Sequence, residues 1–189
     1  MATCHQDVAV SGFGGLEEYY IQGDEDTADS IGHDEYYTPK FMIPMPDIVD
    51  IPAKCPKEIA RQLRAAFSLF WSDTSAAAGR VRVALEQLMD HLKIKRRRKQ
   101  SNGKFTNLTL HDRITIFQAT DSIVGTQLMA LKWLGNAGSH ENSVLKKDLL
   151  DAFEILDHVL VEVFEQRSQK VMSLAKQLTK RHTHRPKKP

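Results

Sequence analysis

Cysteine is scarce in this chain of 189 residues, where only Cys4 and Cys55 occur, far apart. Together with His5 and His33 they match no compact ligand pair of the Cys-x-x-Cys type, so we expect no metal site. A disulfide between the two cysteines is the alternative to free thiols, and we expect free thiols in a reducing cytoplasm. No residue pattern in the chain indicates a cofactor.

Long apolar runs are also missing. No stretch of about 18 apolar residues occurs, so we expect no transmembrane helix and no membrane partner. The N-terminus lacks a basic segment followed by an apolar one, and we therefore expect no signal peptide. Aromatic residues make up only 7% of the chain, which suits aliphatic helix packing. The length fits one domain with a hydrophobic core and is short for two full domains. We expect a cytoplasmic location.

Cations are nearly absent from the first 55 residues. This segment holds eleven Asp and Glu residues against only Lys40 and Lys54, a net charge of −9, and the remainder of the chain carries +11. Such a split indicates either two zones with different partners or an acidic arm that lies on a basic body.

The acidic segment, residues 1–55, shows no helical period, and we predict an irregular N-terminal arm. Two tyrosine pairs, Tyr19-Tyr20 and Tyr36-Tyr37, suggest that buried rings pin this arm onto the body. Five prolines predict an extended, irregular path for residues 38–56. Its apolar residues, Met42, Ile43, Met45, Ile48, Val49 and Ile51, predict that the segment packs along the bundle. Turns are favoured by the glycines at positions 12, 14, 15 and 23.

Apolar residues recur at three- and four-residue spacing from Pro56 onward, which predicts helices. The expected helices cover residues 57–71, about 76–91, 110–119, 122–134 and 146–180. Thr109 is the expected cap of the third, and Asp121 or Ser122 that of the fourth. The last would be roughly 50 Å long, so its far end should project or pair with another subunit. No segment alternates as a strand. The sequence therefore predicts an all-α fold, an antiparallel bundle of about five helices over residues 56–180, with a basic tail at 181–189.

The most basic run of the chain follows the second expected helix. Its charge density predicts a solvated loop, although the same cations suit phosphate binding, because each neutralised phosphate releases a counterion. The C-terminal tail repeats this chemistry. The candidate nucleic-acid-binding residues are Lys95, Arg96, Arg97, Arg98, Lys99 and Lys104.

One apolar helix ends in a cluster of polar groups. Residues 128–140 break at Gly135 and Gly138, around which lie Lys132, Asn136 and His140. RNA cleavage through the 2′-hydroxyl needs a general base near neutral pH, which histidine supplies, and cations or donors around the phosphate. The alternative is structural, because a histidine or asparagine after a helix end can hydrogen-bond to its last carbonyls.

Several segments of the chain together resemble a known family. The order Cys55-Pro56, an apolar helix, Arg82-Val-Ala-Leu-Glu86, a basic link and Leu131-Lys-Trp-Leu-Gly-Asn-Ala-Gly-Ser-His140 resembles the bacterial domain of unknown function four-one-four-five, over roughly residues 50–165. That family is grouped with the HEPN superfamily. The resemblance implies a HEPN-like bundle of four to five helices that forms a homodimer. Many HEPN proteins are metal-independent ribonucleases in toxin–antitoxin, anti-phage and RNA-processing systems.

The resemblance also implies candidate catalytic residues. The HEPN motif is an arginine, commonly followed by a polar residue, and then a histidine after four to six positions. Asn136 and His140 match the polar residue and the histidine, whereas Gly135 stands where the arginine belongs. The nearest upstream cation is Lys132, which lacks the planar fork of arginine. The motif is therefore degenerate.

Arg82 and Glu86 lie four residues apart, a spacing that allows either a solvated ion pair or a role in the site.

Two functions follow from the sequence. The first is a HEPN-like module directed at RNA or a nucleotide, in a bacterial defence, toxin or stress system. The second is a non-catalytic helical homodimer that recruits partner proteins through its acidic arm and long last helix.

Overall fold

The computed structural model describes residues 7–23, 28–101, 103–137 and 144–183. Within these ranges the prediction of an all-α fold is wrong, because two antiparallel two-stranded sheets accompany the helices. The elements are β1 (Ala9–Ile21), β2 (Ser30–Ile43), α1 (Lys57–Leu69), α2 (Thr74–His91), β3 (Arg97–Lys99), β4 (Phe105–Asn107), α3 (Leu110–Gln118), α4 (Ser122–Ala137), α5 (Lys146–Glu165) and α6 (Arg167–Thr183).

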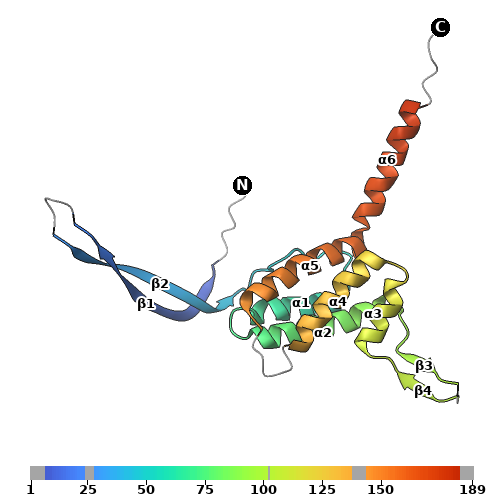
Figure 1. Ribbon diagram of the computed structural model, residues 1–189, viewed down its shortest axis with the longest axis horizontal. Coiled ribbons are helices and arrows are strands. Elements are labelled where there is room, and N and C mark those ends of the chain that lie inside the picture. The colour runs from blue at the N-terminus through green and yellow to red at the C-terminus, as the bar shows by residue number, and fades with distance from the viewer. Residues whose placement is uncertain (1–6, 24–27, 102, 138–143, 184–189) are drawn as a thin grey trace, which may run out of the picture.

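Helices α1 to α5 form the body, from which the β1–β2 ribbon, the β3–β4 hairpin and α6 project in three directions (Figure 1). Helix α2 packs against α1 and α4, and α4 also packs against α3 and α5. Phe67 of α1 and Phe153 of α5 meet edge to face at 5.1 Å in the core. No helix within the described ranges is both long and apolar enough to cross a membrane.

Side-chain capping marks where α2, α3 and α4 begin. The Asp73 carboxylate accepts from the backbone N–H of Ala76 at the start of α2. Thr109 and Asp112 form a capping box at the start of α3. Asp121 accepts from the N–H of Val124 at the start of α4. Capping at Thr109 and Asp121 was expected from the sequence, and both caps are confirmed.

The N-terminal arm is not irregular. Strands β1 and β2 form one long antiparallel ribbon, with Gly15 opposite Tyr36 and Gly32 opposite Tyr19. A Cβ atom at Gly15 would lie 2.8 Å from the Tyr36 hydroxyl, and one at Gly32 would lie 2.5 Å from the Tyr19 ring. These glycines therefore accommodate tyrosine rings from the opposite strand, an aromatic cover for glycine within a sheet. The tyrosines cover the ribbon and do not pin it to the body.

The segment between the ribbon and α1 does lie against the bundle. Ile48, Val49, Ile51 and Cys55 are partly buried against the core. Packing along the bundle, which the apolar residues of the proline-rich segment predict, is confirmed for Ile48, Val49 and Ile51. The earlier part of that segment instead completes strand β2.

The last expected helix is two helices. Gln166 adopts a left-handed conformation with φ of 53° and ends α5. The Glu162 carboxylate then accepts from the backbone N–H of Ser168 at 3.2 Å, which caps the start of α6. The single helix predicted over residues 146–180 is therefore wrong, although its far end does project from the body (Figure 1).

Candidate nucleic-acid interface

The crossing of α2 and α4 brings Arg82 to Asn136. The Arg82 Nη1 group donates a hydrogen bond to the Asn136 Oδ1 atom. The Nε atom of the same guanidinium lies 3.6 Å from a Glu86 carboxylate oxygen. The Arg82 side chain is 33% exposed, so it is held by two partners and still reaches solvent. The Arg82–Glu86 ion pair allowed by the sequence is present, and Asn136 is an additional partner.

Gly135 is what allows the two helices to approach. A Cβ atom at this position would lie 2.9 Å from the Arg82 Cβ and 3.4 Å from the Ala78 carbonyl oxygen. Any larger residue would push α2 and α4 apart, because the Arg82 Cβ is fixed to the helix backbone. Gly135 is thus the residue against which Arg82 of α2 packs.

Replacing each of two helical glycines by alanine should change the free energy of unfolding in opposite directions. Gly79, on α2, has open space around its Cβ position, so Gly79→Ala should raise the free energy of unfolding by about 0.5–1 kcal/mol through helix propensity. Gly135→Ala gains the same propensity but adds overpacking of about 1–3 kcal/mol. We expect it to lower the free energy of unfolding in urea denaturation. Equal stabilisation by both substitutions would contradict the close crossing.

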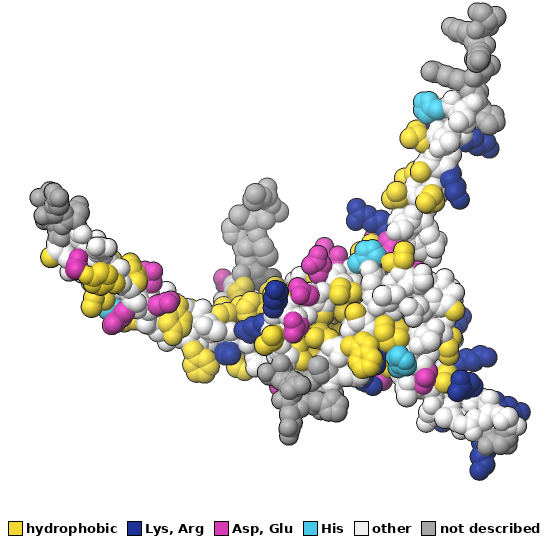
Figure 2. Space-filling model, in the orientation of Figure 1, with side chains coloured by type: hydrophobic (Ala, Val, Ile, Leu, Met, Phe, Trp, Pro, Cys, Tyr) yellow, Lys and Arg dark blue, Asp and Glu magenta, His cyan; other side chains and the backbone are white. Residues whose placement is uncertain are grey.

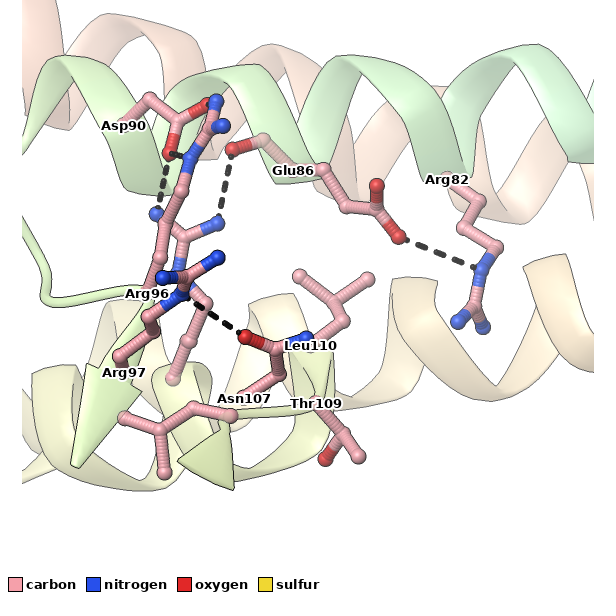
Figure 3. A pocket seen from close by; sticks show the side chains of 10 residues that line it. Arg82, Glu86, Asp90, Arg96, Arg97, Asn107, Thr109 and Leu110 are labelled. Carbon is pink, nitrogen blue, oxygen red and sulfur yellow. Dashed lines mark hydrogen bonds and ion pairs between the residues drawn. The ribbon is translucent and has the colours of Figure 1, made fainter. Parts of the chain in front are cut away.

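Arg82 also lines a pocket of about 510 Å³ that is enclosed by α2, the β3–β4 hairpin and the start of α3 (Figure 3). Four arginines face two carboxylates in its lining, so the side chains of the pocket carry a net charge of +2. The charged lining residues are Arg82, Glu86, Asp90, Arg96, Arg97 and Arg113. A pocket of this composition suits an anion such as a phosphate group.

Asp90 of α2 joins both α3 and the base of the hairpin to the body through two arginines. The Arg113 side chain is only 6% exposed, and its Nη2 atom donates to Asp90 at 2.6 Å and to the Ile94 carbonyl oxygen at 3.0 Å. Arg96, at the base of the hairpin, donates through Nε to the same carboxylate at 2.8 Å. Hydrogen bonds from Arg96 and then Arg113 hold the pKa of Asp90 at about 2, although partial burial acts to raise it.

The basic run forms a hairpin and not the predicted loop. Arg97 lies opposite Asn107, Arg98 opposite Thr106 and Lys99 opposite Phe105. The Arg97 Nε group donates to the Asn107 Oδ1 atom at 3.0 Å. Figure 2 shows cations gathered along this projection. Phe105 is 66% exposed beside them, and cations with an accessible aromatic ring are the groups that bind single-stranded nucleic acid.

The six candidate nucleic-acid-binding residues divide into two groups. Arg96 and Arg97 line the pocket and have partners in Asp90 and Asn107. The other four are exposed, in or beside the hairpin strands, and these are Lys95, Arg98, Lys99 and Lys104.

The candidate catalytic residues are not all brought together. Asn136 contacts Arg82, as described above. Lys132 is only 6% exposed, and its ammonium group lies 3.4 Å from the centre of the Trp133 ring. His140 lies outside the described residues. Sequence reasoning missed Asp90 and Arg113 altogether, since their pairing across 23 positions leaves no local pattern.

A family model described as a domain of unknown function (DUF4145) matches residues 64–181. The chain belongs to this family. The DUF4145 region includes Arg82, the β3–β4 hairpin and Asn136, whereas the β1–β2 ribbon precedes it. No curated protein and no solved structure matches the chain. The arginine-lined pocket therefore lies wholly within the DUF4145 region.

Proposed function

We propose that this chain is an RNA-directed module of the HEPN type, in which the α2–α4 crossing and the β3–β4 hairpin together bind the RNA backbone. The observation that supports this most directly is the hydrogen bond from Arg82 to Asn136. The HEPN motif needs a guanidinium beside its polar residue, and Gly135 occupies the expected position in the sequence. Arg82 supplies that guanidinium from a different helix.

The arrangement of the Arg82 and Asn136 side chains suits a phosphate group. Glu86 and Asn136 hold the Arg82 guanidinium in place from two sides, and a positioned planar fork binds phosphate oxygens through two parallel hydrogen bonds. Because the Asn136 Oδ1 atom accepts from Arg82, its amide NH₂ group is the part that remains to donate to a ligand.

The hairpin extends this surface beyond the pocket. Its exposed cations neutralise successive phosphates, and Phe105 offers a ring on which a base can stack. A flexible single strand fits this combination better than a rigid duplex, because its unstacked bases reach the ring. We therefore propose single-stranded RNA as the ligand.

Cleavage is the further part of this proposal. His140 is the candidate general base for attack by the 2′-hydroxyl, and Lys132 and Asn136 are the other candidate catalytic residues. The HEPN resemblance implies that cleavage needs no metal ion and that two sites meet in a homodimer. The biological setting would be a bacterial defence, toxin or stress system.

Binding of labelled single-stranded RNA at low salt tests the proposal. Arg82→Ala should weaken binding by about 10- to 100-fold, because a charged hydrogen bond contributes about 1.5–3 kcal/mol. The RNA affinity of Arg82→Lys should lie between those of wild type and Arg82→Ala, since lysine keeps the charge and lacks the planar guanidinium. Arg80→Ala is the matched control, because Arg80 is on the same helix and donates to Gln62 of α1. It should change binding by less than about 2-fold.

Cleavage is measured in the same samples. His140→Ala should abolish cleavage and leave the dissociation constant for RNA unchanged, and a metal chelator should have no effect. RNA that stays intact and unbound with the wild-type protein would reject the proposal. So would equal weakening by Arg80→Ala and Arg82→Ala.

The alternative function, a non-catalytic homodimer that recruits proteins, is favoured by the exposed β1–β2 ribbon and α6. It predicts that RNA is neither bound nor cleaved.

A further inference from the structure

The β1–β2 ribbon projects from the body, and among the residues that the structure describes no helix of the body packs against either of its faces. At about 3.3 Å per residue its strands extend roughly 40 Å, and a lone two-stranded hairpin is marginally stable in water. Large apolar side chains are nevertheless exposed along it, including Phe13 at 70%, Leu16 at 63% and Tyr20 at 66%. Burial of these apolar side chains against another surface would stabilise the ribbon.

The ribbon is also acidic in its middle. Glu17 and Asp34 lie directly opposite each other on one face, and like charges in that position destabilise a sheet. Glu18 and Glu35 occupy the opposite face, where His33 lies 3.7 Å from Glu18. The first Lys or Arg of the whole chain is Lys40. The surface that covers this ribbon should therefore be both apolar and basic.

Helix α6 is such a surface. All of its residues are exposed, and it contains no Asp or Glu. Val171, Leu174 and Leu178 follow helical spacing and are 58%, 64% and 57% exposed, which makes an apolar stripe along one side. Lys170 lies four residues before Leu174 and Arg181 three residues after Leu178, so these two cations flank the stripe. A helix of 17 residues has little stability in water without packing, so α6 also needs a partner.

We propose that two copies of this chain exchange these elements, so that the β1–β2 ribbon of each protomer covers α6 of its partner. Figure 1 shows the ribbon and α6 leaving one body in different directions, and Figure 2 shows acidic and apolar groups on the ribbon and basic and apolar groups on α6. Reciprocal exchange gives a closed two-fold dimer, in which both complementary surfaces are used twice. This dimer does not depend on RNA binding.

The lengths agree with this pairing. Helix α6 spans about 25 Å at 1.5 Å per residue, and the ribbon is longer, so it covers the whole apolar stripe. The contact places Glu18 and Glu35, on one face of the ribbon, beside the cations that flank the apolar stripe of α6. Its association should therefore weaken as salt is raised, because screening acts on the charged part and leaves the apolar part.

Charge reversal tests the exchange. The ribbon variant carries Glu18→Lys and Glu35→Lys, which lie on one face of the ribbon, and the helix variant carries Lys170→Glu and Arg181→Glu. The dissociation constant of the dimer should be at least about 100-fold higher for each variant alone than for wild type, because like charges now face each other. A mixture of the two should form a heterodimer, since every contact in it again pairs opposite charges. Sedimentation velocity separates the protomer of 21.4 kDa from the dimer.

Lys57→Glu together with Arg61→Glu on α1 is the matched control, and this variant should dimerise like wild type. Circular dichroism confirms that each variant keeps its helices. The proposal is overturned if wild type remains a protomer at high concentration, if the ribbon and helix variants dimerise normally, or if their mixture does not assemble. Dimers of undiminished strength in both variants would assign the homodimer to another face.

Discussion

Removing four cations from the β3–β4 hairpin should reduce RNA affinity at low salt by about 100-fold or more. The substitutions are Lys95→Gln, Arg98→Gln, Lys99→Gln and Lys104→Gln. They leave Arg96 with Asp90 and Arg97 with Asn107, so the contacts that attach the hairpin remain. The loss arises because fewer phosphates are neutralised and fewer counterions are released.

The salt dependence identifies the cause of this loss. For single strands, each phosphate contact contributes about −0.7 to the slope of log K against log salt concentration, so four lost contacts should make the slope shallower by about 3. Fluorescence anisotropy with labelled RNA between low and moderate salt measures both quantities.

A control variant with the same change in net charge replaces four exposed cations elsewhere on the chain by glutamine: Lys54, Lys57, Arg61 and Lys147. It should bind RNA within about 5-fold of wild type and keep the slope. If this control loses as much affinity as the hairpin variant, binding reflects the total charge of the protein and not the hairpin.

The helices of the body were predictable because their pattern is local. Apolar residues at three- and four-residue spacing report one buried face, and capping residues such as Thr109 and Asp121 act within one turn. The break at Gln166 was not predictable in this way. It involves a non-glycine residue in a left-handed conformation, with neither glycine nor proline to mark it, while the apolar period continues into α6.

The strands were missed for a different reason. Neither face of the β1–β2 ribbon is buried on the body, so its sequence lacks the alternation of apolar and polar residues that indicates a half-buried strand. Gly15, predicted to favour a turn, lies opposite Tyr36, and Gly32 lies opposite Tyr19. Only the pairing of the two strands reveals that each glycine makes room for a ring.

The candidate site was predictable in part. Asn136 was identified from its place in the degenerate motif. Its contact with Arg82 joins residues 54 positions apart and depends on how closely α2 and α4 cross. Arg82 was visible only as the partner of Glu86. The signal for this contact was Gly135, which lies inside a helix and directly before Asn136. A glycine in that place allows a second helix to approach closely, so the missing arginine could have been sought on a neighbouring helix.

Replacing Asp90 by alanine should lower the free energy of unfolding by about 2–3 kcal/mol, because it leaves the Arg113 guanidinium buried without its carboxylate. Arg96 is the larger cause of the low pKa of Asp90, but its side chain is 72% exposed, so water replaces the lost contact. Arg113 decides the effect on stability because it is 6% exposed. Arg96→Ala is therefore the control, with an expected loss of less than about 1 kcal/mol.

The pH dependence of stability separates the charge of Asp90 from its packing. The folded pKa of about 2 lies below the value of about 3.9 for an unfolded chain. The stabilisation from the ionised carboxylate is therefore complete above about pH 4 and is lost as the pH falls toward 2. Asp90→Asn keeps the shape and removes the charge. In urea denaturation the difference in stability between wild type and Asp90→Asn should be constant above pH 4 and shrink below it. A difference that stays constant down to pH 2 would contradict a role for the Asp90 charge, and a loss in Asp90→Ala no larger than in Arg96→Ala would contradict the anchoring by Arg113.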